Sequence, residues 1–284
     1  MNPTTHAVRL GLLRGWIEFR QSLTNVGDVV YYVLLAAVFL AVLFFQRNST
    51  VEGTDLSLAT VVMPSLLGGL LAFQAMGGAA YSLAAEREDG TLLRAKTIPQ
   101  GIIGYLSGRV LGLSMGTLPL LILILIPSLL LVDGLASLDA SRWLTLVWVF
   151  VLGLLATLPL GMIVGSLVKG PRAANTWGIF PTMALVGISG ILYPIQSLPV
   201  WVQNIAQVFP VYWLGLGTRS VFLPDAAAAV EITGSWRHLE TAGVLTAWAI
   251  VGLLLAPIVL RRSARRESGS KVQDRQQEAM KRIG

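Results

Sequence analysis

The chain has 284 residues, with 54% hydrophobic residues, 13% charged residues and a mean hydropathy of +0.70. Soluble domains carry about 25% charged residues, so this composition excludes an ordinary soluble globule. Lys and Arg outnumber Asp and Glu by 21 to 15, giving a net charge of +6. The absence of Cys excludes disulfide frameworks and thiolate metal sites.

Residues 1–28 are predicted to form a cytoplasmic interfacial helix. Val8, Leu12, Trp16 and Phe19 would share one face of such a helix. An amphipathic helix of this kind lies in the membrane surface ahead of the first span, in contact with lipid.

Six long runs without a charged residue follow. A helix rising 1.5 Å per residue needs about 20 apolar residues to cross about 30 Å of hydrocarbon. Five of the runs are each long enough for one membrane-spanning helix. The longest run, 173–218, contains one uninterrupted apolar span, roughly residues 173–193. We therefore expect an all-α membrane protein with six transmembrane helices in one domain, residues 29–260. The charge-free runs are 29–46, 56–85, 110–132, 143–168, 173–218 and 241–260.

The basic residues predict the orientation. With this topology, 17 Lys and Arg residues fall on the side of the N-terminus and 4 fall on the other. Cytoplasmic loops carry this excess, so we expect a multi-pass protein of the plasma (inner) membrane with both termini cytoplasmic. The +6 charge then indicates topology, and no nucleic-acid partner is expected. Eight of the 17 lie in residues 261–284, a basic tail predicted to be disordered and to meet anionic lipid.

The sequence predicts no catalytic residues, metal ligands or cofactor in this chain. The two histidines, His6 and His238, fall on opposite sides of the predicted membrane. Gly90–Thr97 approximates a phosphate-binding loop, but it lacks one glycine and lies between two spans. The cores of the spans contain no ionisable residue, which argues against an ion-driven carrier and requires energy from another source.

Two loops carry distinctive motifs. A charged cluster and a glycine, within Glu86–Leu92, follow the second span on the cytoplasmic side. The outer segment after the fifth span is too apolar for an exposed loop and too rich in Pro for a span. It therefore predicts short re-entrant helices between spans five and six. Its marked residues are Pro194, Pro199, Trp201, Phe209, Pro210 and Arg219.

In order, spacing and sidedness these motifs resemble those of the type-2 ABC exporter permeases, including the daunorubicin-resistance-like drug and lipid exporters. That family has an E-R-E-x-G-T-L-like element, matched by Glu86–Leu92, and a P-I-x-x-L-P-x-W segment, matched by Pro194–Trp201. The resemblance implies a non-catalytic subunit that exports a hydrophobic or amphipathic compound. It also implies two ATP-binding subunits, which hold ATP and Mg²⁺, and a second permease copy or a homologous permease.

The resemblance further implies two sets of functional residues. The loop after span two would be the coupling helix that contacts the ATPase, through Glu86, Arg87, Glu88, Asp89, Gly90, Thr91 and Leu92. Spans two and five would line the substrate path, through Phe73, Gln74, Met76, Asn175, Trp177, Phe180 and Met183. Ordinary core packing explains this second set equally well.

Two alternatives remain open at the level of sequence. One is a permease for a polysaccharide or glycolipid, although the rows of aromatic or polar side chains typical of such paths are sparse. The other is a membrane-embedded, lipid-modifying enzyme. Such an enzyme needs catalytic carboxylates or histidines near an interface, and the outer-loop aspartates have no partners at useful spacing.

Overall fold

A computed structural model of the chain describes residues 2–50, 57–132 and 138–266. These residues are organised as helices, as the sequence predicts, with one isolated bridge between Thr50 and Ser57. The elements are α1 (Pro3–Ser22), α2 (Val26–Gln46), α3 (Leu58–Glu88), α4 (Thr91–Lys96), α5 (Gly101–Leu131), α6 (Ala140–Leu167), α7 (Pro171–Thr176), α8 (Ile179–Ile188), η2 (Ile195–Ser197), α9 (Val200–Val208), α10 (Pro210–Phe222), η3 (Asp225–Val230) and α11 (His238–Arg266).

Five of the described helices, α2, α3, α5, α6 and α11, are long and apolar enough to cross a membrane. The region predicted as the fifth span is instead two short helices, α7 and α8, interrupted at Trp177 and Gly178. Pro181 explains the break, because it has no N–H to donate to the carbonyl of Trp177 four residues earlier. Six uninterrupted spans are therefore not present among the described residues.

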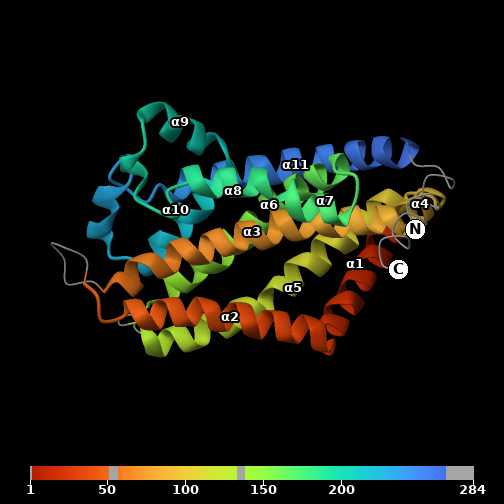
Figure 1. The fold of residues 1–284 in the computed structure, drawn as a ribbon. Helices are drawn as coiled ribbons and strands as arrows, with labels where there is room; N and C mark the ends of the chain where they lie inside the picture. Colours follow the sequence, from red (N-terminus) through yellow and green to blue (C-terminus); the bar gives the residue numbers. More distant parts are fainter. Residues whose placement is uncertain (1, 51–56, 133–137, 267–284) are drawn as a thin grey trace.

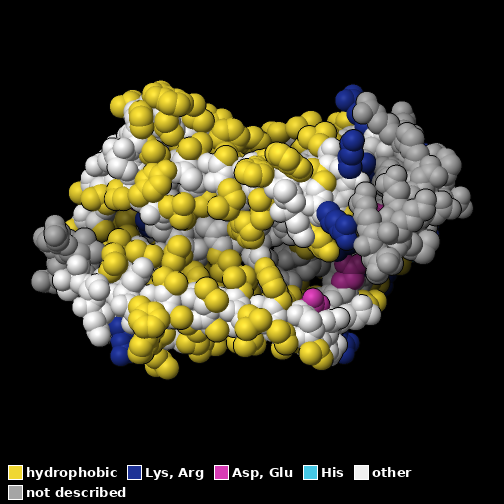
Figure 2. Space-filling model, viewed as in Figure 1, with side chains coloured by type: hydrophobic (Ala, Val, Ile, Leu, Met, Phe, Trp, Pro, Cys, Tyr) yellow, Lys and Arg dark blue, Asp and Glu magenta, His cyan; other side chains and the backbone are white. Residues whose placement is uncertain are grey.

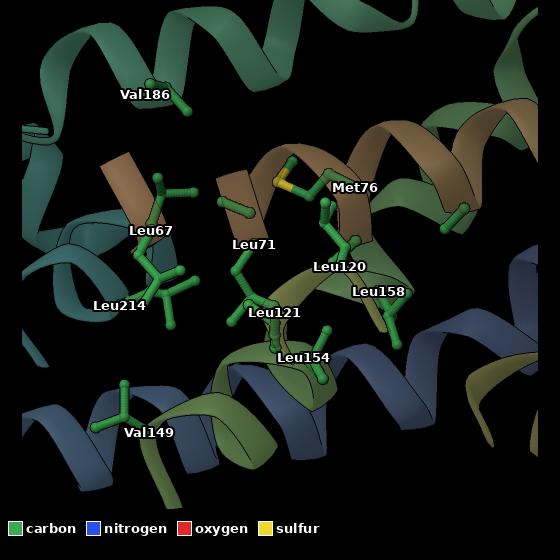
Figure 3. Packing of buried hydrophobic residues seen from close by; sticks show 14 of the residues in the cluster. Leu67, Leu71, Met76, Leu120, Leu121, Val149, Leu154, Leu158, Val186 and Leu214 are labelled. Carbon is green, nitrogen blue, oxygen red and sulfur yellow. The ribbon is translucent and has the colours of Figure 1, made fainter. Parts of the chain in front are cut away.

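Helix α3 is the centre of the bundle. It packs against α6 and α10 on one side and also contacts α2, α5, α7 and α8 (Figure 1). Leu67 and Leu71 of α3 meet Leu214 of α10 and Leu121 of α5 in the core (Figure 3). Every residue of α10 is buried, so this short helix is enclosed by protein on all sides.

Small residues bring two pairs of helices into close approach. The spacings Gly104-x-x-x-Gly108, Gly112-x-x-x-Gly116 and Gly161-x-x-x-Gly165 in the sequence predict close packing of helices within the bundle. Where α1 crosses α5, a methyl group on Gly11 would overlap the Gly104 carbonyl. Where α6 crosses α3, a methyl group on Gly161 would overlap the Met76 carbonyl. Such contacts require glycine because the two backbones touch.

The N-terminal segment is shorter than predicted, since α1 ends at Ser22 and Asn25 caps α2 by accepting the Asp28 N–H at 3.2 Å. The buried face of α1 is formed by Gly11 and Gly15, while Trp16 is exposed on another face. At the other terminus α11 continues beyond the predicted boundary at 260 to Arg266. The rest of the predicted tail, residues 267–284, lies outside the described residues.

The N-terminus, α4 and the C-terminal end of α11 gather at one end of the bundle, and α9 and η3 lie at the other (Figure 1). We call the first the basic end, because it carries Arg94 and Lys96 of α4 and Arg261 and Arg262 of α11. Figure 2 shows hydrophobic side chains across the middle of one face, with the Lys and Arg side chains toward its two ends. This is the surface expected of a bundle that spans a bilayer.

The contact between α3 and α6 predicts that Gly161→Ala destabilises the fold. The added methyl group meets backbone rather than a flexible side chain, so overpacking should cost about 1–3 kcal/mol. Gly243→Ala in α11 is the matched control, because a methyl group there meets no atom within 4 Å. Thermal unfolding of the purified chain in detergent should show a lower midpoint for the first variant only; equal midpoints would contradict the packing.

Candidate functional site

A sharp turn separates the end of α3 from α4 at the basic end. Gly90 adopts φ = 80°, in the left-handed region that favours glycine, and this ends α3. The Asp89 side chain then accepts the Thr91 N–H at 2.8 Å and begins α4. The charged loop predicted from the sequence is therefore a short helix set between two long ones.

Just before this turn, Glu86 lies at the centre of a cluster of charges. Its side chain is buried and accepts hydrogen bonds from Arg109 and Tyr105 of α5, and from Arg14 of α1 at 3.2 Å. Glu18 of α1 closes the cluster, contacting Arg14 at 2.7 Å and Arg109 at 3.3 Å. The cluster joins α1, α3 and α5 immediately beside α4.

The neighbouring residue, Arg87, connects α3 to α6. Its Nη1 donates to the carbonyls of Gly165, Ser166 and Val168, at 3.2, 2.8 and 3.0 Å. These carbonyls belong to the last turn of α6, where no further helical N–H is present to bind them. A cation at this position also suits the negative end of the helix dipole.

The predicted coupling residues therefore divide into two groups. Glu86, Arg87 and Leu92 form contacts inside the chain, and Leu92 is fully buried. Asp89 is exposed, whereas Glu88 and Thr91 are half-buried and Gly90 forms the turn. The exposed surface of α4 and the following residues also includes residues that the sequence analysis did not select, namely Arg94, Lys96, Thr97 and Ile98. Contact with an ATPase remains a prediction for this surface.

A groove of about 570 Å³ opens between α2 and α3, with α5 behind it. Figure 2 shows this face hollowed between α2 and α3. Three of the seven predicted path residues, Phe73, Gln74 and Asn175, line the groove. Tyr31 of α2 crosses it and donates its hydroxyl to the Gln74 side chain at 2.7 Å.

The other four predicted path residues lie elsewhere in this conformation. Met76 is a core residue, 2% exposed, packed where α3 touches α6 (Figure 3). Trp177, Phe180 and Met183 are exposed on the surface of α7 and α8 and the break between them. The sequence analysis missed the aromatic residues of α2, which come from outside the two spans that the resemblance indicated.

The outer segment predicted from its prolines forms η2, α9 and α10. Pro194 and Pro199 precede η2 and α9, Trp201 is exposed on α9, and Phe209 stacks on Trp248 of α11. Pro210 is the first residue of α10, the helix position where proline fits best. The sequence analysis therefore predicted short helices correctly here, whereas their position relative to the outer leaflet remains a prediction.

Arg219 of α10 forms a second buried ion pair, at the end opposite α4. Its Nε and Nη2 donate to the two oxygens of Glu231 at 2.6 and 3.2 Å, and Nη1 donates to the Gly190 carbonyl at 3.3 Å. Both residues of the pair are buried. The sequence analysis selected Arg219 and missed Glu231, because no helical periodicity relates two residues on opposite sides of a loop.

Long apolar helices, an enclosed short helix and charge clusters at both ends define a multi-pass membrane protein. Residues 44–258 match the family model described as ABC-2 family transporter protein, and this match covers most of the chain. The chain therefore belongs to the ABC-2 transporter family and is a membrane subunit of the ABC transporter class.

Two curated relatives carry the same description, "Probable multidrug ABC transporter permease YbhR", one from Escherichia coli strain K12 and one from Escherichia coli O157:H7. Each is 25% identical over 176 residues, which cover 62% of this chain and 47% of the relative. The chain thus aligns with about half the length of these relatives.

The charge cluster around Glu86 predicts that substitutions of Glu86 and Arg109 have non-additive effects on stability. Removing one partner of a buried ion pair leaves an uncompensated charge and costs about 3–5 kcal/mol, whereas replacing both with apolar residues is often close to neutral. Glu86→Met and Arg109→Met should each lower thermal stability, and the double variant should lose less than the sum of the two single losses, because Arg14, Tyr105 and Glu18 still lose a partner. Glu88→Gln, two residues along, is the control with little expected effect. Additive losses in the double variant would show that the pair is not coupled.

The Arg219–Glu231 pair predicts that Arg219→Lys is not a conservative change. Lysine keeps the positive charge but loses the planar fork that reaches both Glu231 oxygens. We expect a loss of about 1–3 kcal/mol, from unsatisfied buried acceptors, measured as a lower unfolding midpoint in detergent. Arg47→Lys, on an exposed position, should leave the midpoint unchanged.

Proposed function

We propose that this chain is the permease subunit of an ABC exporter that moves a hydrophobic or amphipathic compound, a drug, antibiotic or lipid, out of the cytoplasm or the inner leaflet. Two separate ATP-binding subunits, which hold ATP and Mg²⁺, supply the energy. A second permease copy or a homologous permease completes the pore. Membership of the ABC-2 family and the multidrug description of the relatives support this proposal.

The observation that carries the proposal is the position of α4. It is a short helix with an exposed charged surface, joined by short connections to α3 and α5 and in contact with both. A displacement of α4 would be transmitted to α1 and α5 through the hydrogen bonds of Glu86. It would be transmitted to α6 through the hydrogen bonds of Arg87. Such an element suits a coupling helix, because a contact on its surface is transmitted to four long helices at once.

The proposed topology places the basic end in the cytoplasm, with both termini there. Helices α7 and α8 together cover 171–188, about 27 Å at 1.5 Å per residue, and they lie along α3. They supply the sixth crossing as an interrupted helix, in which Gly178 at the break is buried and Trp177 is exposed. Helices α9 and α10 are the re-entrant segments of the outer leaflet; the complete burial of α10 satisfies the requirement that a broken backbone be enclosed at membrane depth.

The proposal predicts that charge reversal on the α4 surface uncouples the transporter. The chain would be co-expressed with the candidate ATP-binding subunits encoded beside its gene, and substrate-stimulated ATPase activity measured in proteoliposomes. Asp89→Arg should lower the stimulated activity at least tenfold, because a charged contact with the partner is reversed. Asp225→Arg is the matched control, since Asp225 is also exposed, lies at the opposite end, and forms only a weak surface pair with Arg142 at 3.7 Å.

Two outcomes would contradict the proposal. One is the absence of any stable complex between the wild-type chain and those ATP-binding subunits. The other is a complex whose stimulated ATPase activity does not respond to Asp89→Arg.

A further inference from the structure

The groove between α2 and α3 carries an excess of negative charge. Its ionised side chains are Glu18, Asp28 and Arg109. Arg109 is shared between Glu18 and the buried Glu86, so its charge is compensated inside the protein. Asp28 is exposed and takes part in no ion pair with any other described residue. Its carboxylate is therefore the charge in the lining of the groove that no described cationic side chain neutralises.

Aromatic rings surround the same space. Tyr31 and Tyr32 follow Asp28 by three and four residues on α2, so all three lie on one helical face. Phe73 and Tyr81 of α3 line the opposite wall. Aromatic faces attract organic cations, and the attraction is greatest where water is excluded.

The α3 wall of the groove contains two glycines that make no close contact with a neighbouring helix. A methyl group on Gly77 or Gly78 of α3 would meet no atom within 4 Å, unlike one on Gly161 or Gly165 of α6. Gly77 and Gly78 line the groove. They leave room for a ligand rather than for a neighbouring helix.

From these three features we propose that the groove binds lipophilic organic cations, with the cationic centre beside Asp28 and the tyrosine rings and the apolar groups along Phe73 and Gly77. This inference rests on the proposed function and specifies its substrate class. An anionic lipid is disfavoured, because its headgroup would meet Asp28 with no uncompensated cation in the lining.

The test is binding of tetraphenylphosphonium and tetraphenylborate, which share one shape and carry opposite charge, to the purified full-length chain in nanodiscs. Binding to protein-free nanodiscs is subtracted. The wild type should bind the cation more tightly than the anion. Asp28→Asn should raise the dissociation constant for the cation about tenfold and leave that for the anion unchanged or lower. Asp225→Asn, a change of the same kind at the opposite end, is the control.

Two further variants locate the ligand. Gly77→Phe should abolish cation binding by filling the groove, whereas Gly243→Phe, in open space on α11, should not. Tyr81→Leu should weaken cation binding about threefold, and Tyr81→Phe should retain it, because the ring rather than the hydroxyl attracts the cation. The unfolding midpoints of all variants are compared with that of the wild type. Because Asp28 is exposed, Asp28→Asn is expected to fold, and it tests the inference even if Gly77→Phe misfolds.

Equal binding of the two probes, preference for the anion, or full cation binding by Asp28→Asn would overturn the inference. Full cation binding by a folded Gly77→Phe variant would do the same. These results need no nucleotide and no partner subunit. Failure of the inference is therefore distinguishable from failure of the exporter proposal, which is measured by ATPase activity of the assembled complex.

Discussion

The buried carboxylate of Glu86 is the contact on which the basic end of the molecule depends. It lies at the last turn of the central helix α3, accepts hydrogen bonds from Arg14, Tyr105 and Arg109, and so joins α1 and α5 to α3. A single buried carboxylate is costly unless its oxygens are bound, so these partners must keep their positions. Because α4 follows within five residues, the same contact positions the proposed docking surface.

Arginines perform a second task, which is to bind the exposed carbonyls of helix ends. Arg87 donates to the last carbonyls of α6 at the basic end. Arg142, near the start of α6, donates to the carbonyls of Val221 and Leu223 at the C-terminal end of α10. The last carbonyls of a helix have no helical N–H to bind, so a buried helix end needs a donor from elsewhere in the protein. The two arginines thereby connect both ends of α6 to its neighbours.

The roles of individual residues show where sequence reasoning was sufficient. Gly161 was expected at a close helix contact from its G-x-x-x-G spacing, and the structure confirms this. Met76 was expected to line a path, yet it is buried beside that same contact. The first expectation came from the glycine spacing and the second from the family resemblance. Neither can tell which of two neighbouring helices covers a given face. Glu231, the partner of Arg219, gave no signal because their pairing depends on how a loop returns to α10.

The sequence by itself determined the all-helical membrane class, the long apolar helices and the short helices of the outer segment. These follow from local composition: apolar length, charge-free runs and proline positions act within one segment of chain. Only the tertiary structure decided that Glu86 is buried rather than exposed, and that Asp28 faces the tyrosines and glycines of a groove. Those facts depend on which helices pack side by side, and contacts between distant segments are not encoded in the pattern of any one of them.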